Sequence, residues 1–286
     1  MSKIKTSNES ISVVIPTYKD HSSLADCVKC LKKQTIDEDF QIIIVDNDPS
    51  PNKIVHIHGE NITIIKERKR GSYAARNAGI KCAKEGIIAF TDADCRPDPD
   101  WLKNSVEEIR AGSPIVAGLT SVTTSKNPSL VEIYEKCFAF DFGFYKQLNR
   151  APTANLIVSS NVFKSIGGFS ELSMSTGDME WCLRATKAGY QINFCSNIIV
   201  YHPARTTFND ILVKTKRVTI GNLEHGFIQR RGYLLKIMKF IIPSRQSITV
   251  LFKSKAKLSW RILAFLIYYV LKMYSLYIQF KFKLKY

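Results

Sequence analysis

The stretch Gly86-Ile-Ile-Ala-Phe-Thr-Asp-Ala-Asp-Cys95 decides the fold of this chain. Its apolar run, residues 87–90, has the length and composition of a short buried strand. Asp92 and Asp94 follow this run, and in an extended segment residues two positions apart point to the same side. Two hard oxygen ligands at one spot suit Mg²⁺ or Mn²⁺, which typically use one or two carboxylates together with substrate phosphates. A plain surface turn is the alternative, because Asp-x-Asp is a common sequence.

The segments around this stretch alternate between short apolar runs and amphipathic helices. Strands are predicted at 12–15, 41–45 and 61–65, and helices at 24–34, 72–85 and 101–110. This alternation predicts an α/β fold with a mostly parallel sheet and helices on both of its faces. Ligands of such sheets bind beyond the carboxyl ends of the strands. Asp46, Asp92 and Asp94 lie at such ends, so the sheet is expected to gather three acids in one crevice.

The following part of the chain is less regular. It is predicted to contain a strand pair at 113–122, an aromatic-rich helix at 128–145, a strand at 156–158, a helix at 178–188 and a strand at 198–201. A Gly-Gly turn and a loop that contains Ser and Gly precede the helix at 178. Gly189 closes this helix, and the last strand ends at His202.

Charge divides the 286 residues into a near-neutral part and a basic part. Residues 1–204 carry 24 Lys and Arg against 23 Asp and Glu, whereas residues 205–286 carry 17 against two. The net charge of +16 therefore rests on the tail, which needs an anionic partner such as nucleic acid, a lipid surface or an anionic substrate. The domain organisation that we predict from charge is a near-neutral domain over 1–205 and a basic, mostly helical region over 206–286.

Cysteine usage and the N-terminus bear on the compartment. The seven cysteines, an odd number in a chain this long, do not look like a disulfide framework. Cys27 and Cys30 form a C-x-x-C pair, but no second Cys or His pair stands at zinc spacing, so we interpret them as ordinary helical cysteines. The first residues are polar and lack the apolar core of a secretory signal. These features predict a protein of the reducing cytoplasm.

Seven short motifs follow one another along the chain in a recognisable order. They are Val14-Ile-Pro-Thr-Tyr18, Ile44-Val-Asp-Asn47, Ala75-Arg-Asn-Ala-Gly79, Thr91-Asp-Ala-Asp94, Ile166-Gly-Gly-Phe169, Gly177-Asp-Met-Glu-Trp-Cys-Leu-Arg184 and Val200-Tyr-His202. Any one of them is weak, but the ordered set resembles family 2 of the inverting, nucleotide-sugar-dependent glycosyltransferases. The resemblance covers residues 10–205 and implies the Rossmann-like GT-A fold. It also implies that residues 1–205 form the catalytic domain, with a nucleotide half at about 10–110 and an acceptor half at about 111–205.

The resemblance also implies where the donor binds. The positions that match the family's nucleotide site are Pro16, Thr17, Tyr18, Asp46, Arg76, Asn77 and Asp92. In the metal motif Asp94 is the expected direct ligand, and Asp92 is expected to be shared between ribose and metal. His202 matches a histidine that completes the metal site in some relatives, although it can equally be a plain strand-end residue. The implied cofactor is Mn²⁺ or Mg²⁺.

The resemblance makes Asp178 the catalytic base. The family usually has Glu-Asp here, whereas this chain has Gly177-Asp178, so any acceptor contact of the missing acid is in doubt. An Asp at this position can also cap the helix that follows. The further candidates for contacts with the acceptor or the leaving diphosphate are Glu180, Trp181, Arg205, Lys214 and Arg217.

The basic tail contains a long apolar segment, residues 258–280. Its uninterrupted apolar core, residues 262–271, is bracketed by Arg261 and Lys272 and is short for a transmembrane helix. Together with residues 234–242 and the flanking lysines, it favours an interfacial membrane-binding region. A packed helical domain, a dimer interface and a true span remain open.

We therefore expect a metal-dependent inverting glycosyltransferase. It would move one sugar from a nucleotide-diphospho-sugar, by default a UDP-sugar, to a polysaccharide or lipid-linked glycan of capsule, O-antigen or teichoic-acid type. It would act as a peripheral protein on the anionic inner face of the cell membrane, and oligomerisation remains open. Two alternatives are a catalytically inactive family member serving as a membrane scaffold, and a nucleic-acid-binding α/β protein. No recognised nucleic-acid motif occurs, so no nucleic-acid partner is expected.

Overall fold

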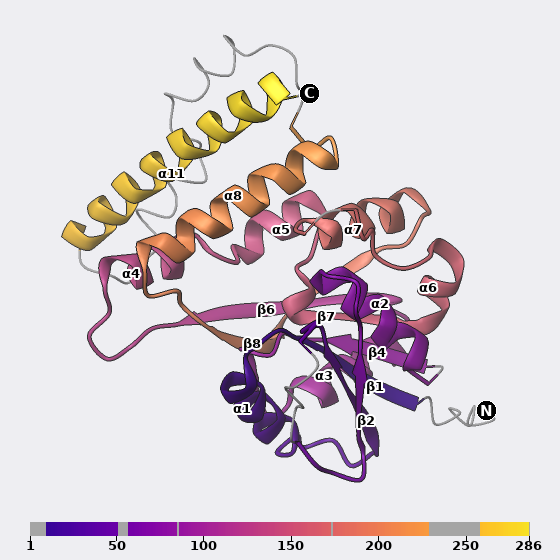
Figure 1. Ribbon diagram of the computed structural model, residues 1–286. Coiled ribbons are helices and arrows are strands. Elements are labelled where there is room, and N and C mark those ends of the chain that lie inside the picture. The colour runs from indigo at the N-terminus through magenta and orange to yellow at the C-terminus, as the bar shows by residue number, and fades with distance from the viewer. Residues whose placement is uncertain (1–9, 51–56, 85, 173, 229–257, 286) are drawn as a thin grey trace. The chain divides into compact units, whose positions relative to one another are not determined.

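The computed structural model describes residues 10–50, 57–84, 86–172, 174–228 and 258–285 (Figure 1). The strands are β1 (Ser10–Thr17), β2 (Phe40–Asp46), β3 (Ile62–Lys66), β4 (Gly86–Phe90), β5 (Arg96–Pro97), β6 (Ile115–Thr123), β7 (Leu156–Ser159) and β8 (Ile192–Pro203). The helices are α1 (His21–Leu31), α2 (Ser72–Cys82), α3 (Trp101–Arg110), α4 (Leu130–Phe138), α5 (Phe142–Leu148), α6 (Ser160–Ile166), α7 (Gly177–Lys187), α8 (Phe208–Glu224) and α11 (Leu258–Lys285), with a 3₁₀ turn at Thr153–Asn155.

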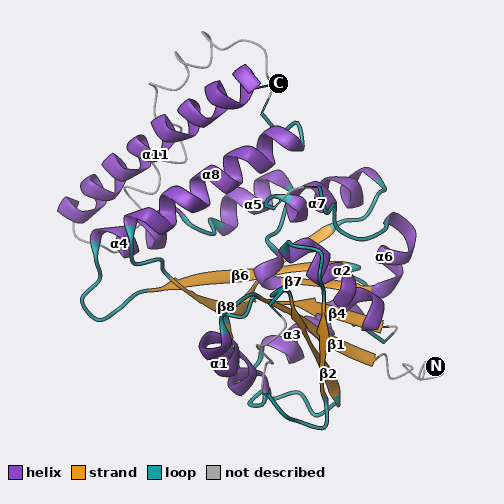
Figure 2. Ribbon diagram, viewed as in Figure 1, coloured by secondary structure: helices purple, strands orange, loops and turns teal. Residues whose placement is uncertain are grey.

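The described strands form one eight-stranded sheet in the order β3-β2-β1-β4-β7-β6-β8-β5. β3, β2, β1 and β4 pair in parallel. β7 runs antiparallel to β4, β6 antiparallel to β7, and β5 antiparallel to β8. The predicted Rossmann-like α/β sheet of the GT-A type is confirmed, as a mixed sheet in which the four N-terminal strands pair in parallel. Figure 2 shows helices on both faces of the sheet.

The continuous apolar runs of the sequence explain this arrangement. β1 and β2 are buried at nearly every position rather than at alternate ones, as strands covered on both faces must be. On one face, residues of α2, α6 and α7 pack with the strands into a single core. Gly79 lets α2 approach closely, because a Cβ atom there would lie 2.4 Å from a methyl group of Val14. This contact fixes α2, which carries Arg76 and Asn77, against β1.

Two sequence-based expectations for single elements were wrong. The predicted strand pair at 113–122 is one strand, β6. Its Gly118 is not a turn: a Cβ atom there would lie 2.4 Å from the carbonyl oxygen of Ile198, so the glycine marks a close approach inside the sheet. The predicted helix at 128–145 is two helices, α4 and α5. Phe140 between them has a positive φ of 53°, which no helix accommodates.

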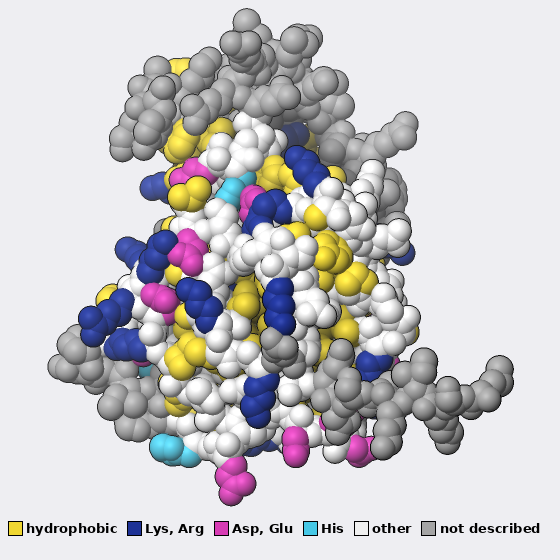
Figure 3. Space-filling model, turned by 90° about the vertical axis from the view of Figure 1, so that its right-hand side faces the viewer, with side chains coloured by type: hydrophobic (Ala, Val, Ile, Leu, Met, Phe, Trp, Pro, Cys, Tyr) yellow, Lys and Arg dark blue, Asp and Glu magenta, His cyan; other side chains and the backbone are white. Residues whose placement is uncertain are grey.

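The chain divides into two compact units. The first comprises the described residues of 1–121, 146–171 and 178–202, and the second those of 122–145, 172–177 and 203–286. The predicted division at residue 205 stays a prediction. The second unit contains α4, α8 and α11, and the basic excess of the sequence falls on its C-terminal part. On the face drawn in Figure 3, Lys and Arg side chains are interspersed with Asp and Glu rather than gathered in one patch.

The tail is helical where the structure describes it. α11 extends the predicted apolar segment to Lys285, and among the described residues it is the one helix long and apolar enough to cross a membrane, by length and composition. The apolar segment at 234–242 lies outside the described residues. Cys27 and Cys30 lie on α1, and all seven cysteines are free thiols.

Candidate active site

The carboxyl ends of β1 and β2 meet at one edge of the sheet. Thr17 pairs with Asp46 in the parallel register, and the N–H of Asn47 donates to the carbonyl of Thr17. The Asp46 carboxylate is buried, accepts the N–H of Asp48 through Oδ1 at 2.9 Å, and has Oδ2 4.0 Å from the Lys66 ammonium. The Thr17 hydroxyl is buried and has no hydrogen-bond partner in the described part of the chain. This edge therefore holds polar groups that a bound ligand can engage.

Pro16 and Tyr18 flank this position. Pro16 is the penultimate residue of β1, and Tyr18, just beyond the strand, is exposed. Both therefore lie at the carboxyl end of a central strand, where ligands of open α/β sheets bind.

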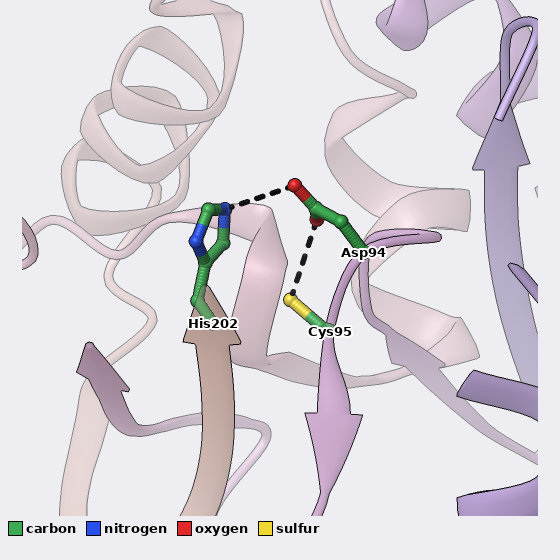
Figure 4. A group of neighbouring side chains, drawn as sticks. All are labelled: Asp94, Cys95 and His202. Carbon is green, nitrogen blue, oxygen red and sulfur yellow. Dashed lines mark hydrogen bonds and ion pairs between the residues drawn. The ribbon is translucent and has the colours of Figure 1, made fainter. Parts of the chain in front are cut away.

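The second edge of the site is the loop after β4. Figure 4 shows the side chains of Asp94, Cys95 and His202 pointing toward one another. Asp94 Oδ2 lies 3.4 Å from His202 Nε2, and the Cys95 sulfur lies 3.9 Å from Asp94 Oδ1. The short strand β5 brings them together, because its pairing of Arg96 with Tyr201 puts the residues before it beside the end of β8.

This cluster fits a divalent cation. The imidazole of His202 is buried, and the Asp94 carboxylate is partly exposed, so a ligand approaching from solvent can complete the coordination shell. Burial, with the negative charges of Asp92 and Asp94, raises the pKa of the Cys95 thiol well above its usual range. A protonated thiol is a poor ligand for a hard cation, so Asp94 and His202 are the donors that the cluster offers.

Asp92 and Asp94 contact different side chains. The Arg76 guanidinium, on α2, forms an ion pair with the Asp92 carboxylate. Arg76 is almost completely buried, lies over the ring of Tyr73, and its Nε has no hydrogen-bond partner among the described residues. A buried guanidinium with unused donor capacity, next to a carboxylate that stays partly exposed, can bind a phosphate or a ribose hydroxyl.

Asn77, the next residue, is engaged with the Gly-Gly turn. Its Nδ2 donates to the carbonyl of Phe169 at 2.8 Å and to the Glu171 carboxylate at 2.7 Å, and its Oδ1 accepts the N–H of Phe169. A Cβ atom on Gly168 would lie 2.5 Å from Asn77 Oδ1, which explains the second glycine of the turn. In this structure Asn77 fixes the turn that precedes α7, and a role in nucleotide binding stays a prediction.

Asp178 lies at the start of α7 and is 8% exposed. Its Oδ1 accepts the Tyr73 hydroxyl at 2.9 Å and its own helix's Met179 N–H at 2.9 Å, and its Oδ2 accepts the N–H of Thr153 at 3.1 Å. Burial, followed by the negative charge of Asp178, raises the pKa of Tyr73 well above its usual range, so this hydroxyl remains a donor. Three donors hold the carboxylate in one orientation.

The other two predicted residues of α7 face the protein. Glu180 pairs with Arg184 at 2.7 Å, and Arg184 donates in turn to the carbonyl groups of Ile166 and Gly168. The Trp181 indole is fully buried and donates to the carbonyl of Gly167 at 2.9 Å. It packs with Phe163 and Phe169 in an aromatic core cluster, which accounts for its position in the structure.

Two of the three basic candidates in the second unit share one buried carboxylate. Glu135, on α4, accepts from Arg205 at 2.8 Å and from Lys214 at 2.7 Å, and its side chain is 1% exposed. Burial alone would raise the pKa of Glu135, but Lys214 and Arg205 together outweigh it, and the pKa lies below its ordinary value. Arg217 is exposed on α8. The cluster keeps one net positive charge, which an anion can use.

Glu135→Gln is expected to lower the free energy of unfolding by about 3 kcal/mol, because it leaves two cations facing a neutral group. The depressed pKa of Glu135 gives the sign of the pH dependence. This contribution is present above the ordinary Glu pKa and is lost as pH falls through the folded-state value. Urea unfolding of both proteins over a pH series measures it. The exposed Glu224→Gln serves as control, and equal unfolding midpoints for Glu135→Gln and wild type would contradict the argument.

Sequence reasoning missed Tyr73, Thr153 and Glu135. The sequence could have identified Tyr73, since it lies three residues before Arg76 and therefore on the same face of a helix. It could also have identified Glu135, as an acid on the inner face of an apolar helix. Thr153 contributes its backbone N–H, so its side chain could give no signal.

The fold and the acids at the strand ends are those expected of a sugar-transferring enzyme, and comparisons with known proteins show that class. Residues 12–165 match the model of "Glycosyl transferase family 2". The chain is 32% identical over 229 residues to glycosyltransferase AglE of Haloferax volcanii, covering 77% of this chain and 75% of that protein. The chain belongs to glycosyltransferase family 2, and it is a glycosyltransferase.

A second sequence relative and a solved structure also match the chain. Chondroitin synthase of Escherichia coli is 33% identical over 137 residues, which cover 45% of this chain and 20% of the synthase. The crystal structure of S. aureus TarS 1-349 in complex with UDP has a TM-score of 0.54 at 17% identity, over 92% of this chain and 90% of that chain. The second match shows a shared fold.

Proposed function

We propose that this glycosyltransferase is metal-dependent and inverting, and that it transfers one sugar from a nucleotide-diphospho-sugar to a hydroxyl of a polysaccharide or lipid-linked glycan. One observation carries the proposal. A single helix, α2, contacts two of the proposed site acids. Its Tyr73 donates a hydrogen bond to Asp178, and its Arg76, one turn further on, forms an ion pair with Asp92. The acid of the donor motif and the acid of α7 thus act as parts of one site.

Asp178 is the proposed base. An inverting transfer needs one carboxylate to take the proton of the acceptor hydroxyl as its oxygen attacks the anomeric carbon opposite the leaving diphosphate. Asp178 is 8% exposed, so it is buried but still reachable from solvent. Hydrogen bonds from Tyr73 and Thr153 fix its carboxylate, so it can receive that proton without first reorienting. The family acid before it is Gly177 here, so Asp178 is the acid of this motif proposed to act.

The donor would bind at the strand edge. Thr17, Tyr18 and Asp46 would hold the nucleobase and ribose, and Arg76 with Asp92 would face ribose and phosphate. Asp94 and His202 would hold Mn²⁺ or Mg²⁺, which when bound neutralises charge on the leaving diphosphate. Arg205, Lys214 and Arg217 follow the His202 motif in the sequence, and from that sequence position alone they are proposed as contacts of the acceptor or the leaving diphosphate.

The comparisons support parts of this proposal. The TarS structure contains UDP, which supports a uridine nucleotide donor, and the name of chondroitin synthase supports a glycan acceptor. A cytoplasmic location at the inner face of the cell membrane is proposed from the basic tail. Intact acids at 92, 94 and 178 speak against an inactive scaffold.

Thermal unfolding of the full chain with a panel of nucleotide sugars tests the proposal. One donor is expected to raise the Tm only when Mn²⁺ is present, since a ligand at about 100 times its Kd stabilises by about 2.7 kcal/mol. With that donor and an acceptor, the anomeric configuration of the product, measured by NMR, is expected to be inverted. No response to any nucleotide sugar, or a retained configuration, would overturn it.

A further inference from the structure

One face of α11 is apolar and exposed. Its exposed large apolar side chains are Leu258, Ile262, Leu263, Leu266, Val270, Met273, Tyr277 and Phe280. At about 100° per residue these eight positions fall within one stripe about 140° wide along the helix. We call these eight residues the α11 stripe.

The opposite side of α11 is packed within its own unit. Ala264, Leu271 and Ile278 recur every seven residues and are buried. The helix packs against α4 and α8. Tyr268 stacks on Phe138 of α4 with ring centroids 5.0 Å apart, and the Ser275 hydroxyl lies 2.7 Å from that of Thr219 on α8. α11 therefore has a protein-facing side and, among the described residues, an uncovered apolar side.

While α11 stays packed against α4 and α8, it cannot span a membrane. α8 carries the exposed charges of Lys216, Arg217 and Glu224, which would enter the hydrocarbon alongside α11. Separation from α8 would instead remove the Thr219 partner of the Ser275 hydroxyl and would place the polar side chains of Ser275 and Gln279 in lipid. A helix that lies in the membrane plane avoids both costs, because only the stripe is immersed.

The charges near the α11 stripe favour lipid over another protein as the partner that covers it. Lys281 lies over the Tyr277 ring at 5.2 Å, and Lys272 lies over the Tyr269 ring at 5.6 Å. These long cations and aromatic rings beside an apolar stripe form the side-chain pattern of a membrane interface. With 17 basic residues against two acids, residues 205–286 of a second copy would repel this one. An anionic bilayer attracts the same charges.

We propose that α11 lies in the plane of an anionic membrane, with the α11 stripe immersed among the lipid chains and α4 and α8 on the protein side. This deepens the membrane location within the proposed function, and it specifies which residues enter the lipid. It also specifies that the helix does not span.

The test is co-sedimentation of the full chain with phosphatidylcholine vesicles, with and without phosphatidylserine. Wild type is expected to bind the anionic vesicles and to come off as NaCl is raised. The triple variant Leu266→Gln, Val270→Gln, Met273→Gln should bind roughly tenfold more weakly, since three immersed apolar side chains become polar. Ile64→Gln, an exposed apolar position of β3, is the matched control and should bind as wild type does.

Each of the other possible outcomes contradicts one specific part of the proposal. Equal binding of the triple variant and wild type overturns the stripe as the membrane contact. Protein that resists extraction with sodium carbonate would show a span. A dimer in light scattering that the triple variant converts to a monomer would make the stripe a protein interface. Donor hydrolysis by the variants in solution is measured in parallel, so vesicle binding without hydrolysis would count against the proposed chemistry alone.

Discussion

Asp178→Asn is expected to lower kcat by roughly 10²–10⁴-fold while donor affinity stays close to that of wild type. The amide occupies the same volume, and its oxygen can still accept the Tyr73 hydroxyl, although its NH₂ group cannot accept the N–H of Thr153. It cannot take a proton from the acceptor. Single-turnover measurements with saturating donor and acceptor, together with donor titration, separate the two effects.

The matched control for this variant is Asp39→Asn, an exposed acid next to the amino end of β2 and thus away from the carboxyl ends that form the site. It should retain wild-type kcat. Should Asp178→Asn also turn over acceptor at the wild-type rate, Asp178 would be a helix-terminal residue with a structural role, and the base would have to be sought elsewhere.

Asp94→Ala is expected to remove metal-dependent binding of the nucleotide sugar, with an affinity loss of roughly 100-fold or more in the presence of Mn²⁺. The substitution deletes the carboxylate that faces His202, and it leaves the pair of Arg76 with Asp92 in place. Calorimetric titration of the donor with and without Mn²⁺ measures the coupling. The EPR signal of bound Mn²⁺ reports on the metal independently of activity.

His202→Ala tests the same cluster from the other strand and should weaken Mn²⁺ binding in the same assay. Asp39→Asn again serves as control. A wild-type donor affinity that does not depend on metal, unchanged in Asp94→Ala, would remove the metal from the proposed site.

Much of the first unit could be predicted from local sequence. α3 has the bounds that its apolar spacing gave, and the strand-end positions of Asp46 and Asp92 follow from where apolar runs stop. Longer-range packing caused the failures. The strand pair predicted at 113–122 was wrong because the sequence does not show that Asn155 and Ile198 pass close to Gly118 inside a single strand.

The candidate site shows the same limit. Strand ends are visible in the sequence, but the partners that orient a side chain come from distant segments. Asp178 is held by Tyr73 and by the backbone of Thr153, and neither pairing follows from spacing along the chain. Glu135 could be seen as an unusual acid, whereas its two cations, Arg205 and Lys214, are brought to it by tertiary structure.

The position of β8 in the sheet has a consequence for biosynthesis. Among the described strands β8 is the last to leave the ribosome, yet it lies between β6 and β5, and β5 has its pairing partner in β8. A nascent chain can therefore pair β1 to β4 while the loop bearing Asp94 still lacks its neighbour in β8. His202 arrives with the end of β8, so the cation cluster is the last part of the sheet to be assembled. An unfinished or truncated chain would carry the edge formed by β1 and β2 without the pairing of Asp94 and His202.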